Sequence, residues 1–229
     1  MGAENEVCGE MAMSAGRFYL AKTDSLCHNG AYMSSTIRLN ICMTPPSETV
    51  KEVVKLAESL PRQGQRFRVD GRTRHPHLTS FMGTFDSVRL DELLTRLKSL
   101  PKVGPLRCNA YGLTISSNYY VEIGYNRNPE LDALQVAVAA AIAGMREAGG
   151  QVDVGMSELE IANQQTYGYK LFGEAYRPHI TLAAYEECRE MTFPAPSTFY
   201  HLDFSVNELT IAESDHFGSV IRIIENLAL

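Results

Sequence analysis

His75-Pro76-His77-Leu78-Thr79-Ser80-Phe81 and Arg177-Pro178-His179-Ile180-Thr181-Leu182-Ala183 repeat one short pattern about a hundred residues apart. Each stretch contains Pro-His, an apolar residue and Thr. Side chains alternate between the two faces of a strand, so His77 and Thr79 share one face, as do His179 and Thr181. The apolar residues then face a core. The pattern predicts two strands that each present an imidazole and a hydroxyl to a cleft.

Two imidazoles and two hydroxyls around one polar space suit the chemistry of a phosphodiester. An imidazole with an ordinary pKa near about 6.5 can act as acid or base at neutral pH, and threonine hydroxyls can donate to non-bridging phosphate oxygens. We therefore interpret His77 and His179 as the catalytic pair and Thr79 and Thr181 as phosphate-binding residues. The sequence leaves open which histidine is the acid and which is the base.

His75 allows an alternative interpretation, because it lies two residues before His77. His75, His77 and His179 would together supply three nitrogen ligands for a metal-dependent hydrolase. The two threonines would then have no evident role, so we expect neither a metal nor a cofactor. Sensitivity to a chelator would separate the two mechanisms.

The paired Pro-His-apolar-Thr stretches resemble the signature of the two-histidine (2H) phosphoesterase superfamily. This superfamily includes cyclic phosphodiesterases, 2′-5′ RNA ligase-like proteins and phosphodiesterases that cleave 2′-5′ oligoadenylates. The resemblance extends from about Thr36 to the C-terminus. It implies an α+β fold that is bilobal and pseudo-twofold, in which two largely antiparallel sheets line a central groove and helices cover the outer faces.

Two functions from different classes follow from this groove. The first is a phosphoric diester hydrolase that opens a 2′,3′-cyclic phosphate or cuts a 2′-5′ linkage in a nucleotide or RNA substrate, by paired-histidine acid-base catalysis. The second is a module that binds a nucleotide or an RNA end without turnover. The presence of both histidines and both threonines favours the hydrolase, although the identity of the phosphodiester stays open.

Composition narrows the class of ligand and the compartment. The chain has 229 residues and a formal net charge of −6, so it lacks the excess of Lys and Arg that holds a DNA duplex. A small nucleotide or an RNA terminus is the expected partner of a monomeric protein. The five cysteines are odd in number and widely spaced, which favours a reducing, cytoplasmic or nuclear compartment. Neither a signal peptide nor a membrane span is predicted.

Apolar periodicity predicts strands and helices that interleave. Alternation predicts a first strand from Thr36 to Met43, and helical spacing predicts three helices: one capped by Ser47, one capped by Asp86 or Ser87, and one from Asn128 to Met145 that ends at Gly149-Gly150. Further strands are expected at 106–115, 119–125, 202–212 and 219–225. Residues 1–34 lack periodicity and are expected to form a leader, either a flexible tail or an added edge element, before a single domain at 35–229.

Aromatic and basic residues near the two motifs are candidates for substrate binding, since bases stack on aromatic rings and phosphates pair with cations. By strand parity, Phe81 shares a face with His77, and Tyr185 shares a face with His179. Tyr169 and Tyr176 are further stacking candidates, and one of Arg74, Lys170 and Arg177 is expected to meet a terminal phosphate. Three other histidines are assigned to the surface or to packing: His28, His201 and His216.

Overall fold

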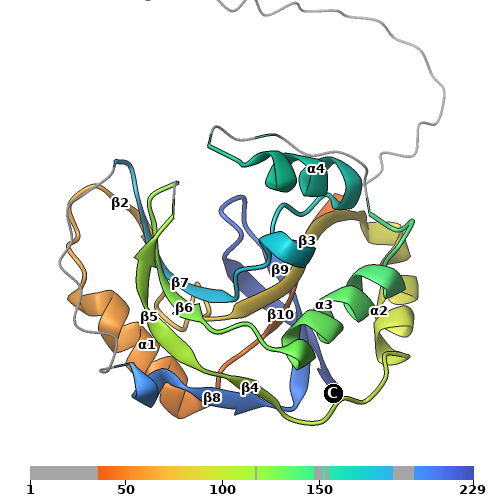
Figure 1. Ribbon diagram of the computed structural model, residues 1–229, viewed down its shortest axis with the longest axis horizontal. Coiled ribbons are helices and arrows are strands. Elements are labelled where there is room, and N and C mark those ends of the chain that lie inside the picture. Colours follow the sequence, from red (N-terminus) through yellow and green to blue (C-terminus); the bar gives the residue numbers. More distant parts are fainter. Residues whose placement is uncertain (1–35, 117, 147–151, 153–154, 188–198) are drawn as a thin grey trace, which may run out of the picture. The chain divides into compact units, whose positions relative to one another are not determined.

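The computed structural model describes residues 36–229 except 117, 147–151, 153–154 and 188–198, and its strands form two large antiparallel sheets (Figure 1). The first sheet has the order β10-β9-β1-β3, with the strands Val220–Ala228, Glu208–Ser214, Thr36–Met43 and Leu78–Asp86. The second has the order β2-β7-β6-β5, with the strands Gln65–Arg68, His179–Tyr185, Tyr120–Tyr125 and Ala110–Ile115. The predicted leader, residues 1–34, lies outside the described residues.

All pairs of neighbouring strands are antiparallel, including those of a small third sheet that joins β4 (Leu106–Cys108) to β8 (Phe204–Val206). The predicted α+β fold with largely antiparallel sheets is therefore confirmed. The His77 motif leads into β3 of the first sheet, and the His179 motif begins β7 of the second. Each large sheet thus contributes one motif strand.

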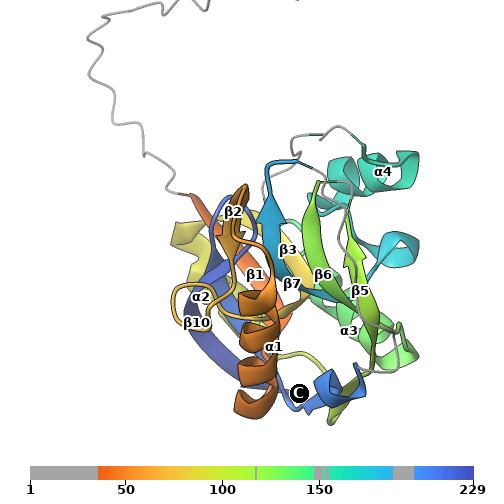
Figure 2. The ribbon, with the colours of Figure 1, turned by 90° about the vertical axis from the view of Figure 1, so that its left-hand side faces the viewer.

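Helices pack on both sheets (Figures 1 and 2). Helix α1 (Ser47–Ser59) packs on β7, α3 (Pro129–Ala141) packs on β3, and α2 (Leu90–Lys98) packs beside α3. The apolar spacing explains this, because Leu93 and Leu97 on α2 lie one helical turn apart and are both buried. Within the described ranges, no helix combines the length and the apolar character needed to cross a membrane.

Capping residues in the sequence predicted the start of α3 correctly, whereas α4 was not predicted. Asn128 accepts a hydrogen bond from the Leu131 amide at the start of α3, as its sequence position predicts. Helix α4 (Glu158–Tyr167) was not predicted, although Ser157 and Glu160 form a capping box at its first turn. Its weak apolar periodicity explains the omission, since only Asn163 is buried along it.

Three predicted element boundaries were wrong for reasons of tertiary context. Helix α3 ends at Ala141 rather than Met145, and Arg96 of α2 donates to the carbonyl groups of Ala141 and Ala143 at this end. The expected strand 106–115 divides into β4 and β5, and the expected strand 202–212 divides into β8 and β9. In each pair the two pieces join different sheets.

Candidate active site

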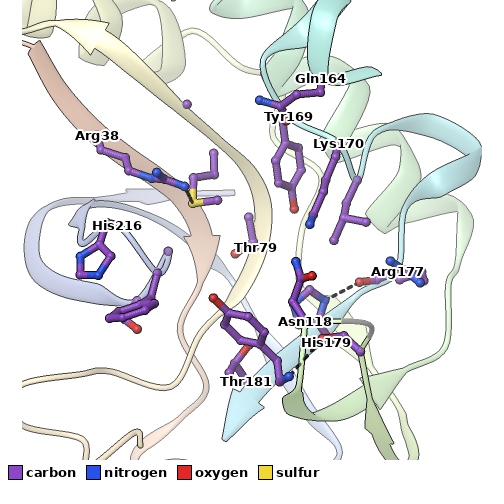
Figure 3. Close-up of a pocket in the computed structure, with 18 of the residues that line it drawn as sticks. Arg38, Thr79, Asn118, Gln164, Tyr169, Lys170, Arg177, His179, Thr181 and His216 are labelled. Atoms are coloured by element: carbon purple, nitrogen blue, oxygen red, sulfur yellow. Dashed lines mark hydrogen bonds between the residues drawn. The ribbon is translucent and has the colours of Figure 1, made fainter. Parts of the chain in front are cut away.

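A pocket of about 620 Å³ brings both motifs together, with His77 just before β3, Thr79 on β3, and His179 and Thr181 on β7. Figure 3 shows Thr79, His179 and Thr181 around it. This volume lies within the range of small-molecule sites. The residue His77 is 9% exposed, and the side chain of His179 is 20% exposed. The structure therefore places all four predicted residues around one space.

The two imidazoles are held in the same way by main-chain carbonyl groups. His77 Nδ1 lies 2.8 Å from the His75 carbonyl oxygen, and His179 Nδ1 lies 2.7 Å from the Arg177 carbonyl oxygen. A carbonyl oxygen only accepts hydrogen bonds, so each Nδ1 carries a proton. In the neutral ring each Nε2 then keeps a lone pair, which is the form that can take up a proton.

His77 contacts a side chain that the sequence pattern did not point to, Asn40 of β1. The amide Nδ2 of Asn40 donates to His77 Nε2 at 3.1 Å and to Thr79 Oγ1 at 3.0 Å, and it lies 3.3 Å from the Gly218 carbonyl oxygen. Burial lowers the pKa of His77 to about 4. His77 is therefore neutral at physiological pH, and its Nε2 accepts the hydrogen bond from Asn40.

His179 has a different neighbour, the carboxylate of Glu122 on β6. Glu122 Oε1 lies 3.6 Å from His179 Nε2, and Glu122 is paired with Thr181 across the strands. In each sheet, then, the strand next to the motif strand supplies one polar side chain to the histidine. Asn40 is neutral and Glu122 is charged, so the two histidines lie in electrostatically different surroundings.

The expectation that Phe81 faces the cleft was wrong. In the pairing of β3 with β1, Ile41 lies opposite Phe81 and Cys42 lies opposite Thr79, so Ser80 is an extra, bulged residue. A bulge shifts strand parity by one residue. Phe81 therefore points into the core, where it is 1% exposed, and it does not line the pocket.

The same displacement occurs in β7, and it corrects the expectation for Tyr185. In the pairing of β7 with β6, Leu182 is the extra residue between Thr181 and Ala183. Tyr185 consequently lies on the core face, is 1% exposed, and donates a hydrogen bond to the Pro61 carbonyl oxygen at 2.6 Å. Each motif strand therefore has a bulge directly after its threonine.

The remaining predicted substrate-binding residues divide between the pocket and the core. Tyr169 and Arg177 line the pocket, and Arg177 forms a 2.9 Å ion pair with Glu160. Tyr176 does not line it; the ring is buried, and its hydroxyl donates to the Thr79 carbonyl oxygen at 3.3 Å. Burial raises the pKa of Tyr169 and of Tyr176, so both hydroxyls stay protonated.

An aromatic cluster forms one end of the pocket, and two of its members, Phe67 and Phe217, were not predicted from the sequence. Phe67 lies with its ring centroid 5.8 Å from that of Tyr120 and 5.2 Å from that of Phe217. The guanidinium of Arg66 lies over Tyr120 and Phe217, at 5.4 and 5.6 Å from the ring centroids. The His216 ring lies tilted against Phe217, with the ring centroids 3.8 Å apart, and His216 lines the pocket, although it was assigned to the surface or to packing.

The three-histidine alternative finds no geometric support. His75 forms a β-bridge with Val220 and does not line the pocket that holds His77 and His179. Among the residues that the structure describes, no group of three or more His, Cys, Asp and Glu side chains is placed to hold a metal ion. Arg74 also lies outside the pocket lining, in a 3.1 Å ion pair with Asp215.

Two antiparallel sheets that bring His-x-Thr strands to one pocket are the arrangement that the resemblance to the 2H phosphoesterases implies. The chain is similar to solved structures of LigT from E. coli, in apo form and complexed with 3′-AMP. Both have a TM-score of 0.59 and 16% identity, and they cover 86% and 85% of this chain and 99% of LigT.

TT0787 of Thermus thermophilus is also similar, with a TM-score of 0.57, 19% identity, and coverage of 84% of this chain and 98% of TT0787. The chain therefore has the fold of LigT, and the resemblance to the two-histidine phosphoesterases is confirmed for the fold. No family model matches the sequence, and no curated protein matches it.

Proposed function

We propose that this protein is a metal-independent phosphodiesterase that acts on 2′,3′-cyclic phosphate or 2′-5′-linked nucleotide and RNA substrates. One observation carries the proposal: His77 and His179 line one pocket from two sheets, and each Nδ1 is bonded to a main-chain carbonyl. Two preorganised Nε2 atoms are what in-line displacement at phosphorus needs, one for each side of the reacting atom.

His77 is the general base in this proposal. Its low pKa keeps it neutral, so Nε2 can accept a proton from the attacking water molecule. That water replaces the Asn40 amide at Nε2, while Asn40 keeps its contacts to Thr79 and Gly218. The attacking oxygen forms the new bond to phosphorus as its proton passes to His77.

His179 is the general acid, because the Glu122 carboxylate stabilises the positively charged imidazolium. His179 gives its Nε2 proton to the leaving oxygen as the second bond to phosphorus breaks. The hydroxyls of Thr79 and Thr181 donate to the non-bridging oxygens, where charge develops. Each positioned proton transfer contributes on the order of 10²- to 10⁴-fold in rate.

The aromatic end of the pocket is the proposed site for a nucleobase. Phe67, Tyr120 and Phe217 line this end of the pocket from three separate segments, and base stacking on aromatic rings tolerates any base. LigT has been solved complexed with 3′-AMP, with phosphate, with NADP+ and with ATP, which supports a nucleotide as the ligand class. We propose a small nucleotide or an RNA terminus as the substrate.

The test is hydrolysis of 2′,3′-cyclic nucleotides and of 2′-5′- and 3′-5′-linked oligonucleotides in EDTA. His77→Gln and His179→Gln are compared with His201→Gln, which changes an exposed histidine outside the pocket lining. We expect turnover that survives EDTA, falls by about 10²-fold or more in the first two variants, and persists in the third. Tight binding of a nucleotide without turnover would instead establish the binding module.

A further inference from the structure

The aromatic end of the pocket depends on one short loop, residues 215–219, which joins β9 to β10. Four consecutive residues of this loop line the pocket: His216, Phe217, Gly218 and Ser219. Figure 3 shows His216 of the loop beside the pocket. The ring of Phe217 packs against Phe67 of β2, with the ring centroids 5.2 Å apart. The conformation of the loop therefore determines where the Phe217 ring lies in the pocket.

Asp215 holds this loop from within. Its carboxylate oxygen Oδ1 accepts hydrogen bonds from the amides of Phe217 and Ser219, both at 2.9 Å. The main chain closes the same turn, because the Asp215 amide donates to the Ser219 carbonyl oxygen and the Gly218 amide donates to the Asp215 carbonyl oxygen, both at 3.0 Å. An aspartate that accepts main-chain amides a few residues ahead stabilises a tight turn. One carboxylate thus sets the position of the residue that carries the ring.

Arg74 fixes this carboxylate from the segment between β2 and β3. Its Nε and Nη2 atoms donate to Asp215 Oδ2 at 3.3 and 3.1 Å. The loop amides use Oδ1 and the guanidinium uses Oδ2, so the two sets of hydrogen bonds do not compete. The same guanidinium lies 5.3 Å from the centroid of the Phe67 ring. Arg74 therefore contacts both the loop and the ring against which Phe217 packs.

The main chain of Arg74 is itself held on both sides. Asp70 Oδ1 accepts hydrogen bonds from the amides of residues 72–74 at 2.8 to 3.0 Å. The next residue, His75, donates through its amide to the carbonyl oxygen of Val220, directly after the loop, at 3.0 Å. The ion pair of Arg74 and Asp215 consequently joins two segments whose main chains are already bonded.

We propose that the ion pair of Arg74 and Asp215 positions Phe217 for stacking on the nucleobase of the substrate. Arg74 and Asp215 are positioning residues, because neither lines the pocket and both act through the ring. A ring that is held in place binds its ligand at a smaller entropic cost than a mobile one. The proposal rests on the proposed phosphodiesterase function and assigns recognition of the base to an ion pair outside the pocket.

The experiment compares 2′,3′-cyclic AMP with glycerol 1,2-cyclic phosphate, which has the same cyclic diester and no base. The measured quantity is the ratio of the two kcat/KM values, and we expect the wild type to prefer the nucleotide by about tenfold or more, the order of one stacked base. Asp215→Asn keeps an oxygen for the loop amides and loses the charge that binds Arg74. This variant and Arg74→Gln should each lower the preference by at least about threefold, mainly through the KM of the nucleotide.

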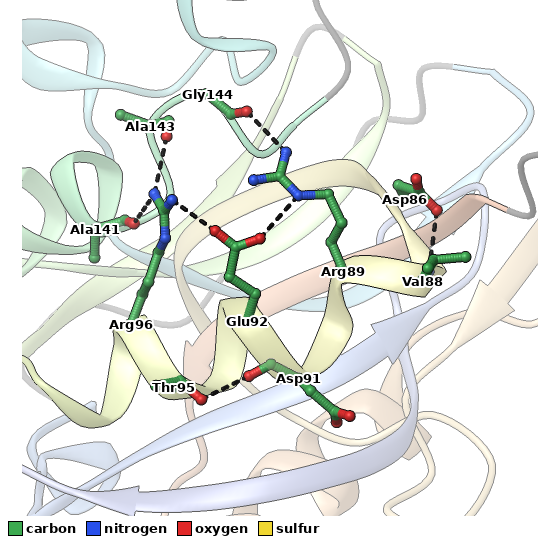
Figure 4. A network of polar contacts seen from close by, with 10 residues as sticks. All are labelled: Asp86, Val88, Arg89, Asp91, Glu92, Thr95, Arg96, Ala141, Ala143 and Gly144. Carbon is green, nitrogen blue, oxygen red and sulfur yellow. Dashed lines mark hydrogen bonds and ion pairs between the residues drawn. The ribbon is translucent and has the colours of Figure 1, made fainter.

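Arg96→Gln is the matched control. Figure 4 shows that Arg96 also bonds a carboxylate, that of Glu92, and main-chain carbonyl groups. It lies outside the pocket lining, so loss of its guanidinium should leave the wild-type preference for the nucleotide in place. An unchanged preference in Asp215→Asn and Arg74→Gln, or an equal loss for both substrates, would overturn the proposal and leave the phosphodiesterase intact.

A double variant tests whether the ion pair acts through the ring. Phe217→Leu removes the ring and should lower the preference for the nucleotide by about tenfold. Adding Asp215→Asn to Phe217→Leu should then lower the preference no further, since residues that act through one another are not additive. A further decrease equal to that of Asp215→Asn alone would overturn the proposal.

Calorimetric binding of AMP and of ribose 5-phosphate separates this proposal from the proposed function. If neither cyclic substrate is turned over, a wild-type preference for AMP that Asp215→Asn and Arg74→Gln reduce and Arg96→Gln retains would support the positioning role. Equal wild-type affinity for the two ligands, or a preference that all variants retain, would overturn it in that case.

Discussion

The burial of His77 makes the stability of the protein depend on pH in a predictable direction. The pKa of this histidine is about 4 in the folded protein, against 6.5 in the unfolded chain. Between these values the unfolded state binds a proton that the folded state does not, so the free energy of unfolding falls as pH falls. Linkage gives a loss of about 2 kcal/mol between pH 7 and pH 5, and about 3 kcal/mol by pH 4.

The assay is urea unfolding at pH 7, 6, 5 and 4 for the wild type and for His77→Gln. Other acidic groups also titrate, so the informative quantity is the difference between the two proteins at each pH. We expect the wild type to lose about 2 kcal/mol more than His77→Gln between pH 7 and pH 5. His201→Gln should follow the wild type, because His201 is exposed. Parallel curves for wild type and His77→Gln would refute the argument.

Three further predictions concern the neighbours of the site. Asn40→Asp places a carboxylate beside His77, so the acidic limb of kcat/KM should move to higher pH by about 1 to 3 units; an unchanged limb would contradict the role of His77 as base. Gln135→Leu removes three buried hydrogen bonds to the main chain, so it should lower the free energy of unfolding, measured by urea titration, by about 3 kcal/mol. A decrease below about 1 kcal/mol would count against this expectation. Glu122→Gln should lower kcat by about tenfold without raising KM, because His179 loses the charge that stabilises its protonated form; a change in KM alone would indicate a binding role.

Local patterns allowed the motif strands and several element starts to be predicted. Strand Thr36–Met43 was predicted with its observed bounds, because its alternation of apolar residues is set within eight residues of chain. The cap at Asn128 was predicted for the same reason, since a cap acts on the next three residues. The pairing of His77 with His179 was predicted because two rare patterns matched each other.

The failures arise where pairing between distant strands decides the geometry. The face on which each side chain of β3 lies was predicted correctly up to Thr79 and wrongly at Phe81. The reason is the bulge at Ser80, which is defined by the pairing of β3 with β1. The aromatic end of the pocket combines Phe67 and Phe217, which lie far apart in sequence and have no shared pattern. No periodicity within a single segment carries this information.

The two bulges also explain how one strand can serve the core and the pocket. Before each bulge the threonine faces the pocket, and after it the parity reverses, so Phe81 and Tyr185 fill the core. A regular strand would have exposed both rings to the cleft and left cavities beneath the sheets. The bulge after Thr79 and the one after Thr181 therefore separate the pocket-facing residues from the core-facing residues at the same point of each motif.

The difference between the two histidines comes from the neighbouring strands rather than from the motifs. His77 and His179 have matching sequence neighbours and matching Nδ1 bonds, so the motifs alone give no reason to assign different roles. Asn40 on β1 offers an amide donor to one ring, and Glu122 on β6 offers a carboxylate to the other. The proposed assignment of His77 as the base and His179 as the acid therefore rests on these two neighbouring strands and not on the motifs.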